Sequence, residues 1–181
     1  MLYLENKKNN LEILISTTKK NNLDFIERIF FENNYENFPI LIINQSQSPL
    51  INSTKESIKI INSDSIGISN SRNLAIQHSS EKYCLFADDD IVYKKGFYEL
   101  VLKEFEQNKY ADVITFMMED ENGNLFKDYT NISKHNKKSI REVNSVVIAF
   151  RREVIIKNNI QFDPLFGLGG TFSTGDEYIF L

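Results

Sequence analysis

Three consecutive aspartates, Asp88-Asp89-Asp90, follow directly on a short apolar run, Tyr83 to Ala87. A run of this length and composition is typical of a buried strand, and the acids stand where such a strand would leave its sheet. Because side chains alternate faces in an extended backbone, we expect Asp88 and Asp90 to point one way and Asp89 the other. Like charges repel at this position, and a divalent cation such as Mg²⁺ or Mn²⁺ would relieve that cost. A solvated acidic turn in front of a helix is the alternative interpretation.

Apolar runs alternate with helically spaced apolar residues on either side of these acids. Alternating strands and helices are typical of right-handed βαβ units and of a mostly parallel sheet flanked by helices. We therefore expect a single α/β domain, since 181 residues are enough to bury a real core. The expected strands before the acids cover 11–16, 40–43 and 58–61, and the expected helices cover 22–34 and 67–80, with Asn22 and Ser69 as N-caps.

The second half of the chain continues the predicted fold with shorter elements. Asn122-Gly123 is a hairpin turn signal. The polar segment 129–141 is interpreted as a mobile loop over the site. The remaining expected elements are an amphipathic helix at 95–108, strands at 111–117 and 144–150, and a short helix at 151–157.

Polar side chains stand at the predicted carboxyl ends of several strands. Ser16 and Thr18 lie at the end of the first strand, Asn44 follows the second, and Asp88 ends the acidic one. In open parallel sheets, ligands bind beyond the carboxyl ends of the strands. These four side chains should therefore converge on one crevice.

The composition excludes several classes of protein. The net charge is −4 and no block of basic residues occurs, so nucleic acid is not an expected partner. The single cysteine, Cys84, cannot form an internal disulfide, and its apolar neighbours predict a buried, inert thiol. Met1 to Lys7 show no signal-peptide pattern, and no run has the length of a membrane span. We therefore expect a cytoplasmic protein with at most peripheral membrane contact.

Four segments, taken in order along the chain, together resemble the family-2 glycosyltransferases of GT-A fold, of the bacterial polysaccharide type. A lone DxD motif would be a weak signal, whereas four motifs in order are specific. Ile13 to Thr18 is similar to the family's first strand and nucleotide-contacting turn, and Ile66 to Asn73 is similar to its GxSxARN stretch. Leu85 to Ile91 with Gly96-Phe97 is similar to its DxD motif and following helix. Phe166 to Gly169 with Gly175-Asp176-Glu177 is similar to its G-acid-acid segment.

The resemblance implies transfer of a sugar from a nucleotide-diphospho-sugar to a hydroxyl of a glycan or lipid-linked acceptor. It further implies inversion at the sugar, a divalent metal cofactor (Mn²⁺ or Mg²⁺) and a role in surface polysaccharide synthesis. Within one domain, 1–110 would be the nucleotide-sugar-binding half and 111–181 the acceptor-side half. We expect the chain to lack a C-terminal extension that such enzymes carry.

The resemblance also assigns roles to individual residues. Asp90 and Asp88 would hold the metal, which neutralises charge on the departing nucleoside diphosphate. Either Asp176 or Glu177 would be the general base on the acceptor hydroxyl, with Glu177 preferred by its order in the motif, and burial would raise the pKa of such a base. The expected nucleotide-sugar-binding residues are Ser16, Thr18, Asn44, Arg72, Asp88 and Asp89.

Plainer interpretations of these residues stay open. Arg72 could form a surface salt bridge, and Gly175 to Glu177 could be a helix start with its acids at the positive end of the helix dipole. The chain also departs from the family pattern, because Asn44-Gln45 stand where members of the family commonly carry two acids. Asn44 can hydrogen-bond a nucleotide base but cannot present the same charge.

Two rival functions compete with the transferase. Asp88 to Val92 also fits the DxDxV pattern of haloacid-dehalogenase-like phosphatases, in which the first aspartate is the nucleophile. That family places the motif on its first strand, whereas at least three predicted strands precede it here. The second rival is a truncated or degenerate domain that binds a nucleotide without transferring sugar.

Overall fold

The computed structural model describes residues 10–48, 50–130 and 132–181. The segment Met1 to Lys7, which carries no signal-peptide pattern, lies outside these ranges. Within them, no helix is both long and apolar enough to cross a membrane.

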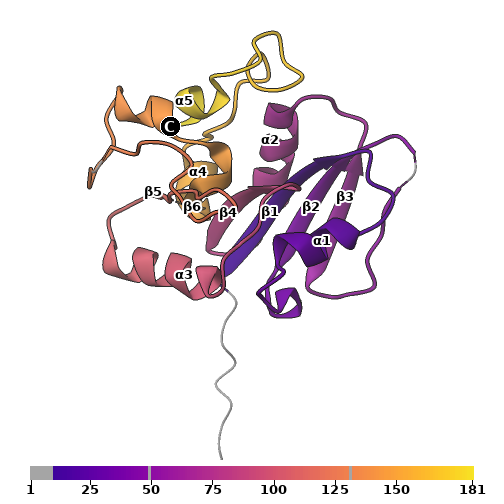
Figure 1. The fold of residues 1–181 in the computed structure, drawn as a ribbon. Coiled ribbons are helices and arrows are strands. Elements are labelled where there is room, and N and C mark those ends of the chain that lie inside the picture. Colours follow the sequence, from indigo (N-terminus) through magenta and orange to yellow (C-terminus); the bar gives the residue numbers. More distant parts are fainter. Residues whose placement is uncertain (1–9, 49, 131) are drawn as a thin grey trace, which may run out of the picture.

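One sheet of six strands runs through the described part of the chain, in the order β3-β2-β1-β4-β6-β5 (Figure 1). Strands β1 to β4 are parallel, whereas β6 is antiparallel to both β4 and β5. The predicted α/β fold with a mostly parallel sheet is therefore confirmed. The strands are β1 (Leu11–Thr18), β2 (Ile40–Gln45), β3 (Ile58–Ser63), β4 (Tyr83–Asp88), β5 (Val113–Thr115) and β6 (Ile148–Arg151).

Helices cover both faces of this sheet (Figure 1). Apolar residues of α1 and α3 pack against one face, and those of α2, α4 and α5 pack against the other. The helices are α1 (Asp24–Ile29), α2 (Ile68–His78), α3 (Phe97–Gln107), α4 (Arg152–Lys157) and α5 (Asp176–Phe180), with 3₁₀ turns η1 (Tyr35–Asn37), η2 (Ser139–Glu142) and η3 (Ser145–Val147).

The strands divide their side chains between these two layers with the period of two that extended backbone imposes. In β4, Leu85 and Ala87 pack in the α1 and α3 layer, while Cys84 and Phe86 pack in the α2, α4 and α5 layer. Cys84 is fully buried, as expected, and burial raises the pKa of its thiol far above the ordinary value. The thiol therefore stays protonated and unreactive in the folded state.

Both N-caps expected from the sequence are wrong. Helix α1 begins at Asp24 after Leu23, because the Asn22 side chain accepts the Asp24 N–H at 3.2 Å and closes a local turn instead of capping. Helix α2 begins after Gly67, and Ser69 lies inside it. The Ser69 hydroxyl donates to the carbonyl of Phe166 at 2.7 Å, so it joins two distant segments.

The second half of the chain is more irregular than expected. The strand expected at 111–117 is only β5 (Val113–Thr115), and 144–150 divides into η3 and β6. The helix expected at 95–108 is α3, which begins after Gly96 in the left-handed conformation. The Asn122-Gly123 turn is confirmed, since Asp120 donates its N–H to the carbonyl of Asn124 across it.

Candidate active site

A cavity of about 780 Å³ opens at the carboxyl ends of β1 to β4. The strand register brings these ends level, since Ser16 lies opposite Asp88, and Thr18 opposite Gln45. Two residues of a much later loop, Leu168 and Gly169, complete the wall. The full lining is Ser16 to Lys19, Gln45 to Ser48, Ser63 to Ile68, Asp88 to Asp90, Leu168 and Gly169.

The described lining of this cavity carries an excess of negative charge. Asp64, Asp88, Asp89 and Asp90 contribute four carboxylates, and Lys19 is the one basic residue among them. Hydroxyl and amide side chains make up most of the rest. Such a surface repels an anionic ligand unless a cation accompanies it.

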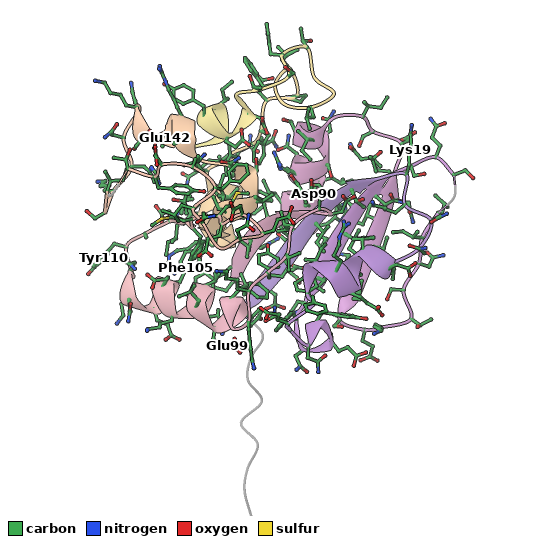
Figure 2. The ribbon with its side chains drawn as sticks, viewed as in Figure 1. Lys19, Asp90, Glu99, Phe105, Tyr110 and Glu142 are labelled. Carbon is green, nitrogen blue, oxygen red and sulfur yellow. The ribbon has the colours of Figure 1, made fainter. Side chains whose placement is uncertain are left out.

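Asp88 and Asp89 point to opposite faces of the sheet, as the alternation predicts. Asp88 faces α2, where its Oδ1 lies 3.4 Å from Nη2 of Arg72. Asp89 faces the α1 side, where it pairs with the Lys20 ammonium at 3.1 Å and accepts the Thr17 hydroxyl. Burial raises the pKa of Asp88; Arg72 acts against this rise, and the nearby charge of Asp90 adds to it. Asp90 lies at the exposed rim of the cavity (Figure 2).

The two hydroxyls expected at the end of β1 both line the cavity. Ser16 accepts a hydrogen bond from the Ser71 hydroxyl of α2 at 2.8 Å. The Thr18 hydroxyl donates to the carbonyl of Gln45 at 3.1 Å. These bonds fix the cavity wall to α2 and β2.

Asn44 lies beneath the cavity and outside its lining, whereas we expected its side chain to join Ser16, Thr18 and Asp88 in one crevice. Its side chain is fully buried on the α1 side of β2 and exchanges two hydrogen bonds with the backbone of Lys20. A third bond joins it to Asn62 at 3.0 Å. Because side chains alternate along a strand, Gln45 takes the place in the lining that was expected of Asn44.

Arg72 is a buried residue, so its interpretation as a surface salt bridge is wrong. Its side chain is 5 % exposed and donates through Nη1 to Asp176 at 2.6 Å. The guanidinium lies 5.5 Å from the centre of the Phe162 ring, and its Nε has no hydrogen-bond partner in the described structure. Arg72 thus links the DxD acid Asp88 to Asp176, the first acid of α5, which lies 104 positions beyond Arg72 in the sequence.

The two candidate bases have different partners. Burial, followed by the charge of Glu177, raises the pKa of Asp176 above its ordinary value. Burial also acts on Glu177, but a hydrogen bond from the Ser145 hydroxyl at 2.6 Å acts against it, and the net shift of the Glu177 pKa is downward. Asp176 and Glu177 lie outside the cavity lining, as do the described residues of the segment 129–141, which was expected to cover the site.

The start of α2 and the loop before α5 are in direct backbone contact. Ile68 donates its N–H to the carbonyl of Leu168 at 2.8 Å, next to the Ser69–Phe166 bond. A Cβ built on Gly169 would lie 2.8 Å from the Cα of Gly67, so only glycine permits this approach. The sequence pattern marked the glycines of this loop but did not indicate that they form a wall of the cavity.

The chemistry of the acids fits a divalent cation shared with a ligand. The described residues contain no group of three or more His, Cys, Asp or Glu side chains arranged to hold a metal by themselves. Mg²⁺ and similar ions are commonly held by one or two carboxylates together with substrate phosphates and water. Asp88 and Asp90 could supply those carboxylates from the cavity wall.

A comparison with protein families extends this picture to nearly the whole chain. The profile described as "Glycosyl transferase family 2" matches residues 4–173. The chain belongs to this family. The match covers the first three motifs and Phe166 to Gly169 of the fourth, whereas Gly175 to Glu177 lie beyond its end. The assignment disfavours the phosphatase alternative, whose acidic motif lies on the first strand and not on β4.

Solved structures support the same fold for this family-2 chain. The S. aureus TarS 1-349 structure in complex with UDP-GlcNAc matches with a TM-score of 0.64 and 16% identity, over 85% of this chain and 48% of that one. The S. aureus TarS structure matches with a TM-score of 0.66 and 14% identity, over 93% of this chain and 33% of that one. The family-2 chain therefore spans between a third and a half of these proteins. A comparison with curated proteins found no match.

Proposed function

We propose that this domain transfers a sugar from a nucleotide-diphospho-sugar to an acceptor hydroxyl, with inversion and in the presence of Mn²⁺ or Mg²⁺. The observation that carries the proposal is the acidic cavity at the carboxyl ends of the strands, in a chain that belongs to glycosyl transferase family 2. The family and the fold support a glycosyltransferase, and TarS, whose fold is similar, has been crystallised with UDP-GlcNAc. A glycan or lipid-linked acceptor in polysaccharide synthesis, and a cytoplasmic location, belong to the same proposal.

The charge of the cavity makes the divalent cation necessary in this proposal. A nucleoside diphosphate would meet four carboxylates and one ammonium in the described lining. Asp88 and Asp90 would hold the cation, which, when bound, neutralises charge on the departing diphosphate. Asp89, already paired with Lys20, would set the position of the turn that carries both metal ligands.

The nucleoside would lie along the ends of β1 and β2. Ser16, Thr18 and Gln45 present hydroxyl and amide groups there, and such groups can bind a ribose or a base by hydrogen bonds. Asn44 would act from below by holding the backbone of Lys20, and Arg72 by orienting Asp88. Residues 1–110 would thus supply most of the donor site, with Leu168 and Gly169 contributed by the second half.

We assign the general base to the pair Asp176 and Glu177. Of the two, the Glu177 carboxylate would accept the proton of the acceptor hydroxyl. Asp176 is 4 % exposed and bound to Arg72, so protonating it would remove the partner of a buried guanidinium. Glu177 is less buried and is held by Ser145. Its lowered pKa keeps it ionised and able to accept a proton at neutral pH.

Titration calorimetry with UDP, GDP and dTDP, each with and without Mn²⁺, tests the proposal. We expect one diphosphate to bind, and its affinity to fall at least about tenfold when Mn²⁺ is omitted. Asp90→Ala should remove the Mn²⁺-dependent part of the affinity, with little change in melting temperature, because Asp90 is exposed. The matched control is Asp128→Ala, since Asp128 is an exposed aspartate outside the cavity lining.

Absence of metal-dependent binding by every diphosphate would contradict the proposal. Unfolding of Asp90→Ala would show that Asp90 is structural. Metal-dependent binding without transfer by the longest natural form of the protein would favour the alternative of a nucleotide-binding domain that is no longer an enzyme.

A further inference from the structure

Lys19, at the end of β1, has a backbone conformation that residues other than glycine seldom adopt. Its φ is 54°, in the left-handed region. Strained conformations of this kind persist only where the surrounding structure holds them, and they concentrate at functional sites. The conformation of Lys19 therefore indicates that surrounding contacts hold this turn, and that its position is a functional one.

Hydrogen bonds on both sides of Lys19 hold the strained turn. The N–H of Lys19 donates to the carbonyl of Gln45 at 3.2 Å. The buried side chain of Asn44 accepts the Lys20 N–H at 3.1 Å and donates to the Lys20 carbonyl at 3.2 Å. The Lys20 ammonium is in turn fixed by Asp89. Two residues of β2 and one acid thus determine the course of this turn.

The two neighbouring lysines of this turn have different surroundings. Lys20 is committed to Asp89, whereas Lys19 is exposed and lines the cavity. No hydrogen bond or ion pair of the Lys19 ammonium occurs with any residue that the structure describes. Lys19 and Asp90, both labelled in Figure 2, line the same cavity, so a ligand that fills it would lie near both.

We propose that the Lys19 ammonium binds a phosphate oxygen of the nucleoside diphosphate. The inference rests on the proposed donor site and adds a residue to it. Phosphate is the strongest acceptor in such a ligand, and lysine binds it as a point charge. Lys19 is the single cationic side chain that the described lining offers against four carboxylates, so it partly offsets the repulsion that the acids impose on the ligand.

Four variants separate the charge of Lys19 from its backbone strain. Lys19→Gln removes the charge and keeps the strain, and Lys19→Arg keeps both. Lys19→Asn removes the charge and relieves strain, because asparagine tolerates this backbone region. The matched control is Asn159→Lys, since exposed Asn159 has a φ of 51° and lies outside the cavity. Asn159→Lys places a lysine at a second left-handed position, whereas Lys19→Asn removes a lysine from the first.

The experiment measures affinity for UDP, GDP, CDP, ADP and dTDP in Mn²⁺, together with melting temperature. For the diphosphate that binds most tightly, Lys19→Gln should lose about tenfold in affinity, and Lys19→Arg should stay within about threefold of the wild type. Lys19→Asn should lose affinity and gain about 1–3 °C in melting temperature. Asn159→Lys should lose melting temperature and keep its affinity. The parent nucleoside, titrated by NMR, should bind wild type and Lys19→Gln alike.

Each contrary result has a distinct meaning. If the wild type binds a diphosphate and Lys19→Gln binds it equally well, the Lys19 proposal is overturned and the proposed function stands. If the nucleoside loses as much affinity as the diphosphate, the ammonium contacts the nucleoside and the proposal is again overturned. If the wild type binds none of the five diphosphates, both proposals fail together.

Discussion

At the scale of single residues, Asp88 combines burial with charged neighbours of both signs. Burial raises its pKa from the ordinary 3.8, Arg72 lowers it, and Asp90 raises it further. The folded protein therefore binds the Asp88 proton more tightly than the unfolded chain does. Ionised Asp88 consequently reduces the free energy of unfolding at neutral pH, and protonation restores that free energy as the pH falls through the raised pKa.

Asp88→Asn should therefore raise the melting temperature at pH 7 in a metal-free buffer. The gain should shrink as the pH falls towards 4, because wild-type Asp88 becomes protonated there and resembles the variant. Adding Mn²⁺ should stabilise the wild type and leave the variant unchanged. Scanning calorimetry across this pH range measures all three effects. A lower melting temperature of the variant at pH 7 would mean that the contact with Arg72 outweighs the cost of burial.

The sequence predicted which residues lie near the strand ends, but it did not predict which of them pair with one another. Strand alternation correctly placed Asp88 and Asp89 on opposite faces of the sheet. The ion pair of Arg72 with Asp176 joins residues 104 positions apart, and no local pattern encodes it. Lys19 was missed because the sequence showed only a pair of lysines, and the left-handed turn that separates them depends on Asn44 of the next strand.

At the scale of elements, the start of α2 and the loop 164–175 behave as one unit. Ile68 and Ser69 are bonded to Leu168 and Phe166, and the backbones of Gly67 and Gly169 touch. This contact attaches the loop that leads to the acids of α5 to the helix that carries Arg72. Disturbing it should therefore affect stability more than an ordinary loop change.

Gly169→Ala should lower the free energy of unfolding by about 3 kcal/mol or more, because the new Cβ meets backbone and the φ of 84° disfavours alanine. The matched control is Gly96→Ala. Gly96 has a similar φ of 80°, but its Cβ would meet nothing within 4 Å, so only about 1 kcal/mol of backbone strain is expected. Urea denaturation of both variants measures the difference. Equal losses would show that the approach of Gly67 to Gly169 is not tight in solution.

The type and order of the elements followed from the sequence better than their ends did. Apolar runs such as 40–43, which became part of β2, predict strands because burial on both faces leaves few other interpretations. Helix starts were misplaced because Asn22 and Ser69, both typical caps, form other hydrogen bonds. The direction of β6 was not predicted, since the irregular segment that leads into it carries no pattern that decides between parallel and antiparallel pairing.

At the scale of the whole molecule, the sheet separates two apolar layers. One layer lies under α1 and α3, and the other lies under α2, α4 and α5, the helices that include Arg72 and the acids of α5. Phe180 belongs to the second layer, where its ring stacks on Phe162 at 4.1 Å and meets the edge of Phe86. Phe180 is thus the apolar anchor of the short helix α5, which Asp176 and Glu177 also hold through Arg72 and Ser145.

Phe180→Ala should lower the free energy of unfolding by about 3 kcal/mol, because it removes a ring that is 6 % exposed. Ile179→Ala is the control on the same helix. Ile179 is 43 % exposed, so its loss should cost less than about 1 kcal/mol. Chemical denaturation of the two variants tests the contrast. Similar small losses would indicate that α5 is detached in solution, and Asp176 with it.

The Arg72 guanidinium contacts acids from both halves of the chain, Asp88 through Nη2 and Asp176 through Nη1. A divalent ion held by Asp88 would neutralise that carboxylate and weaken its attraction for Nη2 of Arg72. Arg72 already lies closer to Asp176, at 2.6 Å, than to Asp88, at 3.4 Å, and it would then be left to Asp176 alone, so we expect the Asp176 proton to be held less tightly. In the proposed donor site, the acidity of Asp176 would therefore depend on whether the cation is bound.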